Sequence, residues 1–201
     1  MEVWILVNNR AGRQHARENG EQVRRVFALG GARARVAYTD TVEEGAVFLQ
    51  QAVEAQPDLL VCCGGDGTLS QALNVLQQLD AKLPLGYVPM GTTNDFAASL
   101  GLPKEPAKAA EQILHGQPRL LDLGRFGERE FLYVASFGAF TQSSYKAAPQ
   151  VKAVLGHLAY VLESAKELPF LRACSLQVDT GDALYEGEYL FGAVSNTLSV
   201  G

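Results

Sequence analysis

Cys63-Gly64-Gly65-Asp66-Gly67-Thr68-Leu69 stands between an apolar run at 58–63 and a segment with helical spacing at 69–79. Glycines at a strand-to-helix turn let the backbone come close to a ligand, because no Cβ stands in the way. The start of a helix adds free N–H groups and a partial positive charge, which suit phosphate. Asp66 would repel phosphate unless a divalent cation lies between them or the carboxylate accepts a proton from an incoming hydroxyl. The stretch therefore indicates phosphoryl transfer from a nucleotide.

Other glycine-rich loops fit this stretch less well. The Gly-Lys-Ser/Thr of a P-loop is missing, and Ser70 stands where a dinucleotide-binding fingerprint has its third glycine. The remaining alternative is a tight turn that only ends a buried strand. A Gly-x-Ser-x-Gly elbow does not occur in the chain, so the sequence gives little support to a serine hydrolase.

Two more loops follow apolar runs in the same way. The segment 89–95 reads PMGTTND, and the segment 8–12 reads NNRAG. Asn94 and Asp95 also favour helix starts, so capping alone is an alternative explanation for them. In an open parallel sheet, however, ligands bind beyond the carboxyl ends of the strands. The three loops are therefore predicted to converge on one nucleotide.

The hydrophobic pattern predicts two kinds of structure along the chain. Strands are expected at 2–7, 33–38, 58–63 and 85–88, and helices near 13–29, 43–55 and 68–79, with short helices up to about 115. This alternation predicts a parallel sheet covered on both faces. Beyond it, hairpins are expected from 120–126 with 131–135 and from 176–178 with 184–194, separated by a helix at 151–168. That helix either packs on its own sheet or shapes an entrance for lipid.

Composition limits the function further. The net charge of −5 argues against nucleic acid as a partner, and no apolar run approaches the length of a transmembrane span. The three cysteines, Cys62, Cys63 and Cys174, have no metal-ligand spacing. They are expected to be reduced thiols in the cytoplasm, with the adjacent pair pointing to opposite faces of a strand.

These loops in combination resemble the soluble bacterial diacylglycerol kinases and related lipid kinases. Gly-Gly-Asp-Gly-Thr at 64–68 is shared with NAD kinases and phosphofructokinases, whereas Gly-Thr-Thr-Asn-Asp-Phe-Ala at 91–97 is typical of the lipid-kinase branch. The segments 134–141 and 195–201 resemble that branch as well. The resemblance implies an α/β fold. It also implies a parallel-sheet nucleotide-binding domain, expected at 1–121, and the start of a β-sandwich lipid-substrate domain, expected at 122–201.

The resemblance also implies roles for individual residues. Asp66 is the expected catalytic residue, and Asp66, Asp95 and Asp122 are expected to act on Mg²⁺ through water. Contacts with ATP are expected from residues at the strand ends: Asn8, Gly12, Thr39, Gly64, Gly65, Asp66, Gly67, Thr68, Gly91, Thr92, Thr93 and Asn94. The first loop departs from the family's Asn-Pro-x-Ser-Gly, because its proline and serine are absent.

Family members typically continue well beyond the position of Gly201. The general-base glutamate, in an Asp-Gly-Glu motif, is expected in that further part. Glu186-Gly187-Glu188 looks similar, but it precedes the 195–201 segment, and both glutamates are expected to face solvent. The chain is therefore expected to be part of a kinase, and whether it catalyses by itself is left open.

The implied reaction is transfer of the ATP γ-phosphoryl group to a lipid hydroxyl, with diacylglycerol giving phosphatidic acid as the first choice. The implied partner is a lipid at the membrane surface. It would be reached by a cytoplasmic, peripheral protein that crosses no membrane and could form a homodimer. The alternatives are a kinase of the same superfamily acting on a sphingoid base or NAD, and a nucleotide- or lipid-binding module without catalysis.

Overall fold

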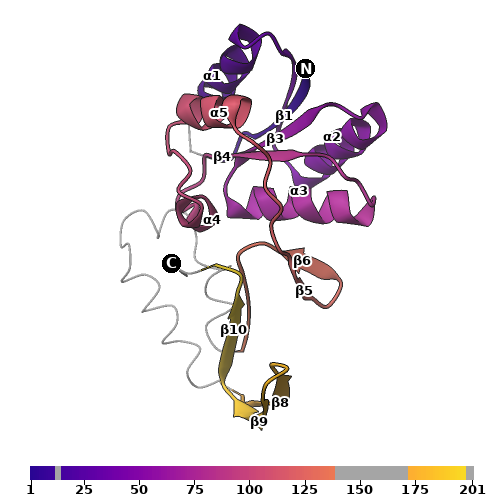
Figure 1. Cartoon of the computed structure of the whole chain (residues 1–201), viewed down its shortest axis with the longest axis vertical. Helices are drawn as coiled ribbons and strands as arrows, with labels where there is room; N and C mark the ends of the chain where they lie inside the picture. Colours follow the sequence, from indigo (N-terminus) through magenta and orange to yellow (C-terminus); the bar gives the residue numbers. More distant parts are fainter. Residues whose placement is uncertain (12–14, 139–171, 198–201) are drawn as a thin grey trace. The chain divides into compact units, whose positions relative to one another are not determined.

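The computed structural model describes residues 1–11, 15–138 and 172–197 (Figure 1). Contacts divide the chain into two compact units, Met1–Tyr133 with Asn196–Gly201, and Val134–Ser195. The functional domain limits 1–121 and 122–201 stay a prediction. Gly12 and the expected helix at 151–168 lie outside the described residues.

The sheet of the first unit has four parallel strands in the order β2-β1-β3-β4. Their bounds are β1 Glu2–Asn8, β2 Arg33–Thr39, β3 Leu59–Gly64 and β4 Leu85–Pro89. Asn8 pairs with Thr39, and Gly64 pairs with Pro89. The strands therefore end at one edge of the sheet, and the predicted parallel α/β fold is confirmed.

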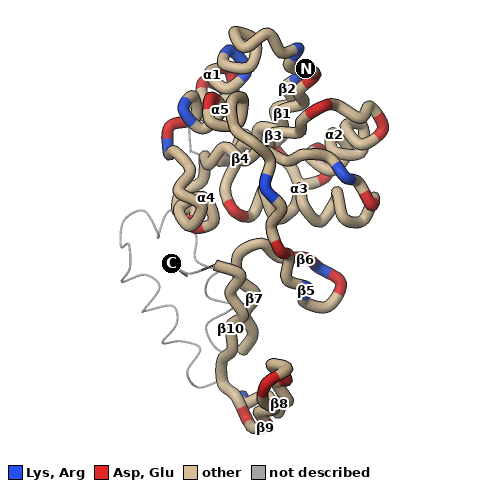
Figure 2. Tube along the Cα trace, viewed as in Figure 1, with Lys and Arg blue, Asp and Glu red and all other residues tan. Residues whose placement is uncertain are grey.

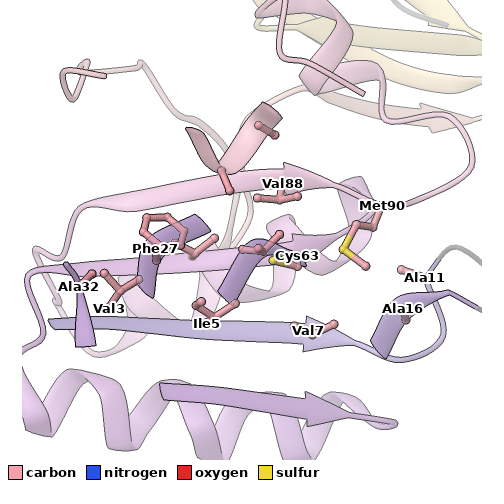
Figure 3. Packing of buried hydrophobic residues seen from close by; sticks show 14 residues of the cluster. Val3, Ile5, Val7, Ala11, Ala16, Phe27, Ala32, Cys63, Val88 and Met90 are labelled. Carbon is pink, nitrogen blue, oxygen red and sulfur yellow. The ribbon is translucent and has the colours of Figure 1, made fainter. Parts of the chain in front are cut away.

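Helices cover both faces of this sheet, as Figure 1 shows. Their bounds are α1 Ala16–Leu29, α2 Val42–Ala55, α3 Asp66–Gln78, α4 Asp95–Ser99 and α5 Pro106–His115. One core cluster joins α1 and α5 to Val3, Ile5 and Val7 of β1, which share one face in Figure 3. The other joins α2, α3 and α4 to Trp4 and Leu6. The alternation along β1 thus supplies apolar side chains to two cores.

The strands β3 and β4 are almost entirely buried, and their residues are uncharged. No Asp, Glu, Lys or Arg occurs in β3 or β4, whereas Figure 2 shows charged residues on the helices, the loops and the hairpins β5–β6 and β8–β9. Cys62 and Cys63 lie in opposite core clusters, which confirms the predicted alternation of their side chains. Burial raises the pKa of the Cys62 thiol to about 12. Both groups are therefore structural thiols.

The hairpin predicted around residues 127–129 is present but shorter than expected. It consists of β5 (Gly124–Phe126) and β6 (Arg129–Phe131). The strand predicted to continue to residue 135 is interrupted, because Leu132 and Tyr133 pack against the core cluster of α2, α3 and α4. The next strand, β7 (Val134–Gly138), belongs to the second unit.

The second unit contains two-stranded antiparallel sheets. β8 (Cys174–Asp179) pairs with β9 (Leu184–Tyr189), as predicted, whereas β10 (Phe191–Ser195) pairs with β7. The single strand expected at 184–194 was therefore wrong, since the chain changes sheets at Leu190. Glu186 and Glu188 are exposed, as predicted. Among the described helices, none combines the length and apolar character needed to cross a bilayer.

Candidate active site

The three loops predicted to converge do meet at the carboxyl edge of the sheet. The Asn8 Nδ2 group donates a hydrogen bond to Thr68 Oγ1 at 2.8 Å, which joins the loop after β1 to α3. The Met90 N–H donates to the Gly64 carbonyl at 2.7 Å, which joins the loops after β3 and β4. Residues from three separate strand ends are therefore held against one another.

Glycine is required at position 91 by close packing. A methyl group there would lie 2.6 Å from Gly65 Cα and 2.7 Å from Asn94 Oδ1. Real Cβ atoms do not approach other atoms so closely, and a backbone carbon cannot rotate away. Gly91 therefore lets the turn after β4 touch the turn after β3.

Gly67 presents the opposite situation. A methyl group at this position would meet no atom of the described residues within 4 Å, and the residue is exposed in the first turn of α3. Glycine inside a helix costs about 1 kcal/mol relative to alanine. Neither packing nor a left-handed backbone explains it here, so Gly67 leaves a stretch of backbone uncovered that a ligand can approach.

Asp66 connects the phosphate-type loop to α4. Its Oδ2 atom accepts a hydrogen bond from the Asp95 N–H at 2.9 Å, and its Oδ1 atom accepts one from the Phe96 N–H at 3.3 Å. The Tyr87 hydroxyl lies 3.5 Å from the same Oδ1 atom. Asp66 thus caps a helix that begins 29 residues later, a role that sequence reasoning missed because the donors are distant along the chain.

Asn94 shapes the second turn. Its backbone is left-handed, with φ of 53°. Its Oδ1 atom accepts from the Gly91 N–H at 2.9 Å, and its Nδ2 group donates to the Gly91 carbonyl at 2.8 Å. The amide is thus engaged within the turn, whereas Thr92 and Thr93 are exposed. A recess of about 320 Å³ adjoins this turn and is lined in part by Asn19, Thr92, Thr93 and Lys104.

Asp95 lies beside Asp66. Burial and the Asp66 charge raise the pKa of the Asp95 carboxyl, and a hydrogen bond with the Tyr133 side chain opposes that rise. Within the described ranges, no ion pair involves either carboxylate. Two neighbouring carboxylates without a basic partner are chemically suited to a divalent cation.

Asp122, the third residue predicted to act on Mg²⁺, has different surroundings from Asp66 and Asp95. Asp122 is exposed, and its backbone carbonyl accepts a hydrogen bond from Asn196 Nδ2 at 2.6 Å. Across the part of the chain that the structure describes, no three His, Cys, Asp or Glu side chains lie close enough together to hold a metal ion. The Asp66, Asp95 and Asp122 network therefore stays a prediction.

The remaining predicted ATP contacts lie along the same edge, except Gly12, which is outside the described residues. Thr39 is buried at the end of β2, and its hydroxyl lies 3.5 Å from the Val7 carbonyl. Asn8 accepts a hydrogen bond from the Arg10 N–H at 2.9 Å through Oδ1. Both side chains are engaged with the protein, so any contact that they make with a nucleotide stays a prediction.

The raised pKa of Asp95 gives a prediction about stability. A carboxyl with a raised pKa binds its proton more tightly in the folded protein, so its contribution to stability is lost as the pH rises through that pKa. Asp95→Asn should therefore raise the melting temperature at neutral pH. This gain in melting temperature should vanish when the pH falls below 3.8, the ordinary pKa of aspartate.

Thermal unfolding across this pH range tests the prediction. Asp182→Asn, in the exposed loop between β8 and β9, is the matched control and should change little. A loss of melting temperature in Asp95→Asn at neutral pH would show that the charge of Asp95 is compensated in the fold.

The diacylglycerol kinase catalytic domain family matches residues 2–126, more than half of the chain. The chain belongs to this family. A diacylglycerol kinase from Bacillus subtilis (strain 168) is 33% identical over 198 residues, which are 98% of this chain and 65% of that protein. A diacylglycerol kinase from Staphylococcus epidermidis (strain ATCC 12228 / FDA PCI 1200) is 32% identical over 81% of this chain and 51% of that protein. The chain thus spans between half and two thirds of these relatives.

Solved structures agree with the diacylglycerol kinase fold. A crystal structure of a diacylglycerol kinase from Bacillus anthracis str. Sterne has a TM-score of 0.75, with 24% identity over 98% of this chain and 64% of that chain. A second crystal structure from this organism has a TM-score of 0.80, with 25% identity over the whole of this chain and 66% of that chain. The parallel sheet followed by antiparallel strands is therefore the architecture of the family.

Proposed function

We propose that the protein containing this chain transfers the γ-phosphoryl group of ATP to the hydroxyl of a lipid, with diacylglycerol as acceptor and phosphatidic acid as product. The observation that carries this proposal is the uncovered backbone at Gly67, held beside Asp66 and Asp95. The names of the relatives support diacylglycerol as the acceptor. The lipid would be met at the membrane surface by a cytoplasmic, peripheral protein.

The start of α3 offers donors for phosphate. Gly65 stands at the N-cap position and, being glycine, has no side chain that could accept a hydrogen bond from the first N–H groups of α3. Its carbonyl accepts hydrogen bonds from the Thr68 and Leu69 N–H groups. The N–H groups of Asp66 and Gly67 precede these and have no acceptor among the described residues, as is usual for the first residues of a helix. Two free donors beside an uncovered glycine fit a phosphate group of ATP.

Mg²⁺ would be held by Asp66 and Asp95, because carboxylate oxygens are its preferred protein ligands. When bound, it neutralises charge on the phosphates. The backbone donors to Asp66 keep its carboxylate in one orientation, so the residue is positioned before any ligand arrives. The recess beside Thr92 and Thr93 offers room for another part of the nucleotide.

In the proposed step, the bond between the γ-phosphorus and its bridging oxygen breaks, and a bond forms to the lipid hydroxyl oxygen. The hydroxyl proton would pass to a general base, and the family resemblance leads us to expect the glutamate of an Asp-Gly-Glu motif in this role. The residues described here would bind the phosphates and stabilise their charge, which supplies most of the catalytic effect in phosphoryl transfer.

Gly67→Ala tests the phosphate contact. The methyl group has open space in the protein, so the free energy of unfolding should increase by about 0.4–1 kcal/mol. It would stand between the backbone and a phosphate, so ATP affinity should fall by about 10-fold, the equivalent of one hydrogen bond to a charged group. Calorimetric titration with ATP and chemical unfolding measure the two effects.

Gly45→Ala provides the matched control, because Gly45 lies inside α2 and a methyl group there would meet, among the described residues, only Leu6 Cδ2 at 4.0 Å. It should stabilise the fold without changing ATP affinity. Unchanged ATP affinity in Gly67→Ala would remove this turn from the nucleotide site.

The acceptor is tested separately. The complete protein should transfer labelled phosphate from ATP to diacylglycerol in mixed micelles, and not to sphingosine or NAD. Transfer to sphingosine or NAD would identify another kinase of the superfamily. ATP binding without transfer to any of them would identify a binding module. Sedimentation would show whether the protein is a homodimer.

A further inference from the structure

Asn74 lies in the interior of α3, where asparagine is disfavoured because its amide competes with the helix backbone. Here the amide makes three hydrogen bonds. Its Nδ2 group donates to the Ser70 carbonyl at 2.8 Å and to the Glu130 carbonyl at 3.1 Å. Its Oδ1 atom accepts from the Glu130 N–H at 3.0 Å. Asn74 is therefore held by a strand that lies 56 residues further along the chain.

The two bonds with Glu130 are reciprocal. Asn74 donates to one backbone group of Glu130 and accepts from the other, as a residue of an antiparallel neighbour would. The hairpin β5–β6 needs such support, because it has three residues in each strand and pairs with no further strand among the described residues. An isolated two-stranded hairpin is marginal in water. The Asn74 amide thus acts as a second pairing partner for β6, which lies beside α3 in Figure 1.

The hairpin leads directly to the candidate site. Leu132 and Tyr133 follow β6 and pack against the core cluster that contains Tyr87 and Phe96. The Tyr133 carbonyl accepts a hydrogen bond from the Asn196 N–H at 2.8 Å, which fixes the backbone at this point. The Tyr133 side chain in turn forms a hydrogen bond with the Asp95 side chain. α3 therefore carries Asp66 at its start and, through Asn74, the segment that reaches Asp95.

We propose that Asn74 is a positioning residue of this site. Its amide fixes β6 on α3 and thereby sets where Tyr133 meets Asp95. The effect on phosphoryl transfer rests on the proposed function, whereas the attachment of β6 does not. Asn74 itself touches neither nucleotide nor lipid in this assignment.

Amide hydrogen exchange of Glu130 tests the attachment in the complete protein. In Asn74→Ala, exchange at Glu130 should accelerate by about 10-fold, the equivalent of one lost hydrogen bond. Asn74→Asp retains an acceptor for the Glu130 N–H, so exchange should stay slower than in Asn74→Ala. The NMR resonances of the Asp95 and Phe96 amides should shift in Asn74→Ala. Gln71→Ala, on the exposed face of the same helix, should change none of these.

Kinetics test the positioning. In Asn74→Ala, kcat should fall by about 10- to 100-fold, since misplacement of about 1 Å has effects of that size. ATP affinity should stay within about twofold, because the free N–H groups at the start of α3 are unchanged. Asn74→Asp should recover part of kcat. If Asn74 served overall stability alone, Asn74→Ala would lower the melting temperature, and kcat and ATP affinity would change by similar factors.

The proposal is overturned if Glu130 exchange is unchanged in Asn74→Ala, if the Asp95 and Phe96 resonances do not move, or if ATP affinity falls as much as kcat. If the unsubstituted protein transfers no phosphate, the proposed function fails. The exchange and NMR measurements then still decide whether Asn74 holds β6 and sets the surroundings of Asp95.

Discussion

Asp66→Asn is expected to reduce turnover by about 10²- to 10⁴-fold, the range for loss of a catalytic side chain, while the protein remains folded. Asparagine keeps one carbonyl oxygen, so it can still accept a hydrogen bond from Asp95 or Phe96 in α4. It removes the negative charge with which a Mg²⁺ ion or a reacting hydroxyl would interact. Steady-state kinetics of the complete protein with diacylglycerol, together with the melting temperature, measure both consequences.

Asp66→Ala separates the two roles of the same residue. Its turnover should fall as far as that of Asp66→Asn. It should also lose the cap of α4, which lowers the free energy of unfolding by about 0.5–2 kcal/mol. For a chain of this size, each kcal/mol lowers the melting temperature by about 2–4 °C. A melting temperature equal to that of Asp66→Asn would show that the cap contributes nothing, and substantial turnover in either variant would remove Asp66 from the reaction.

Gly91→Ala is expected to disrupt the site from its interior. The added methyl group would lie 2.6 Å from Gly65 Cα, a backbone atom that cannot rotate away. Overpacking of this kind costs about 1–3 kcal/mol. The two turns must separate, so ATP binding should become undetectable. Chemical unfolding and calorimetric titration measure the two effects.

Gly67→Ala is the informative comparison, because it should stabilise the fold while it weakens ATP binding. A Gly91→Ala protein with normal stability and normal ATP affinity would mean that the two turns are not packed together in the working protein. Opposite effects on stability at two nearby glycines would distinguish packing from ligand approach.

Prediction from sequence succeeded where the signal is local. The strands β1 to β4 and their helices follow from apolar periodicity, and the loops after β1, β3 and β4 follow from glycine and polar residues at strand ends. Parallel strands end at one edge, so the meeting of these loops could also be predicted. The interruption at Leu132 could not be predicted, because the sequence pattern of 131–135 is that of a continuous strand. The strand is broken by packing of Leu132 against a core that is distant along the chain.

The amino-acid sequence alone was sufficient to predict the α/β architecture, the family and the candidate glycines and carboxylates of the site, because each depends on neighbours within a few positions. The folded molecule was needed to show that Asp66 caps α4, that Gly91 touches Gly65 and that Asn74 holds Glu130. These contacts join residues 26 to 56 positions apart. Hydrogen bonds and steric contacts of that range depend on how the elements pack, and no local pattern of residues encodes them.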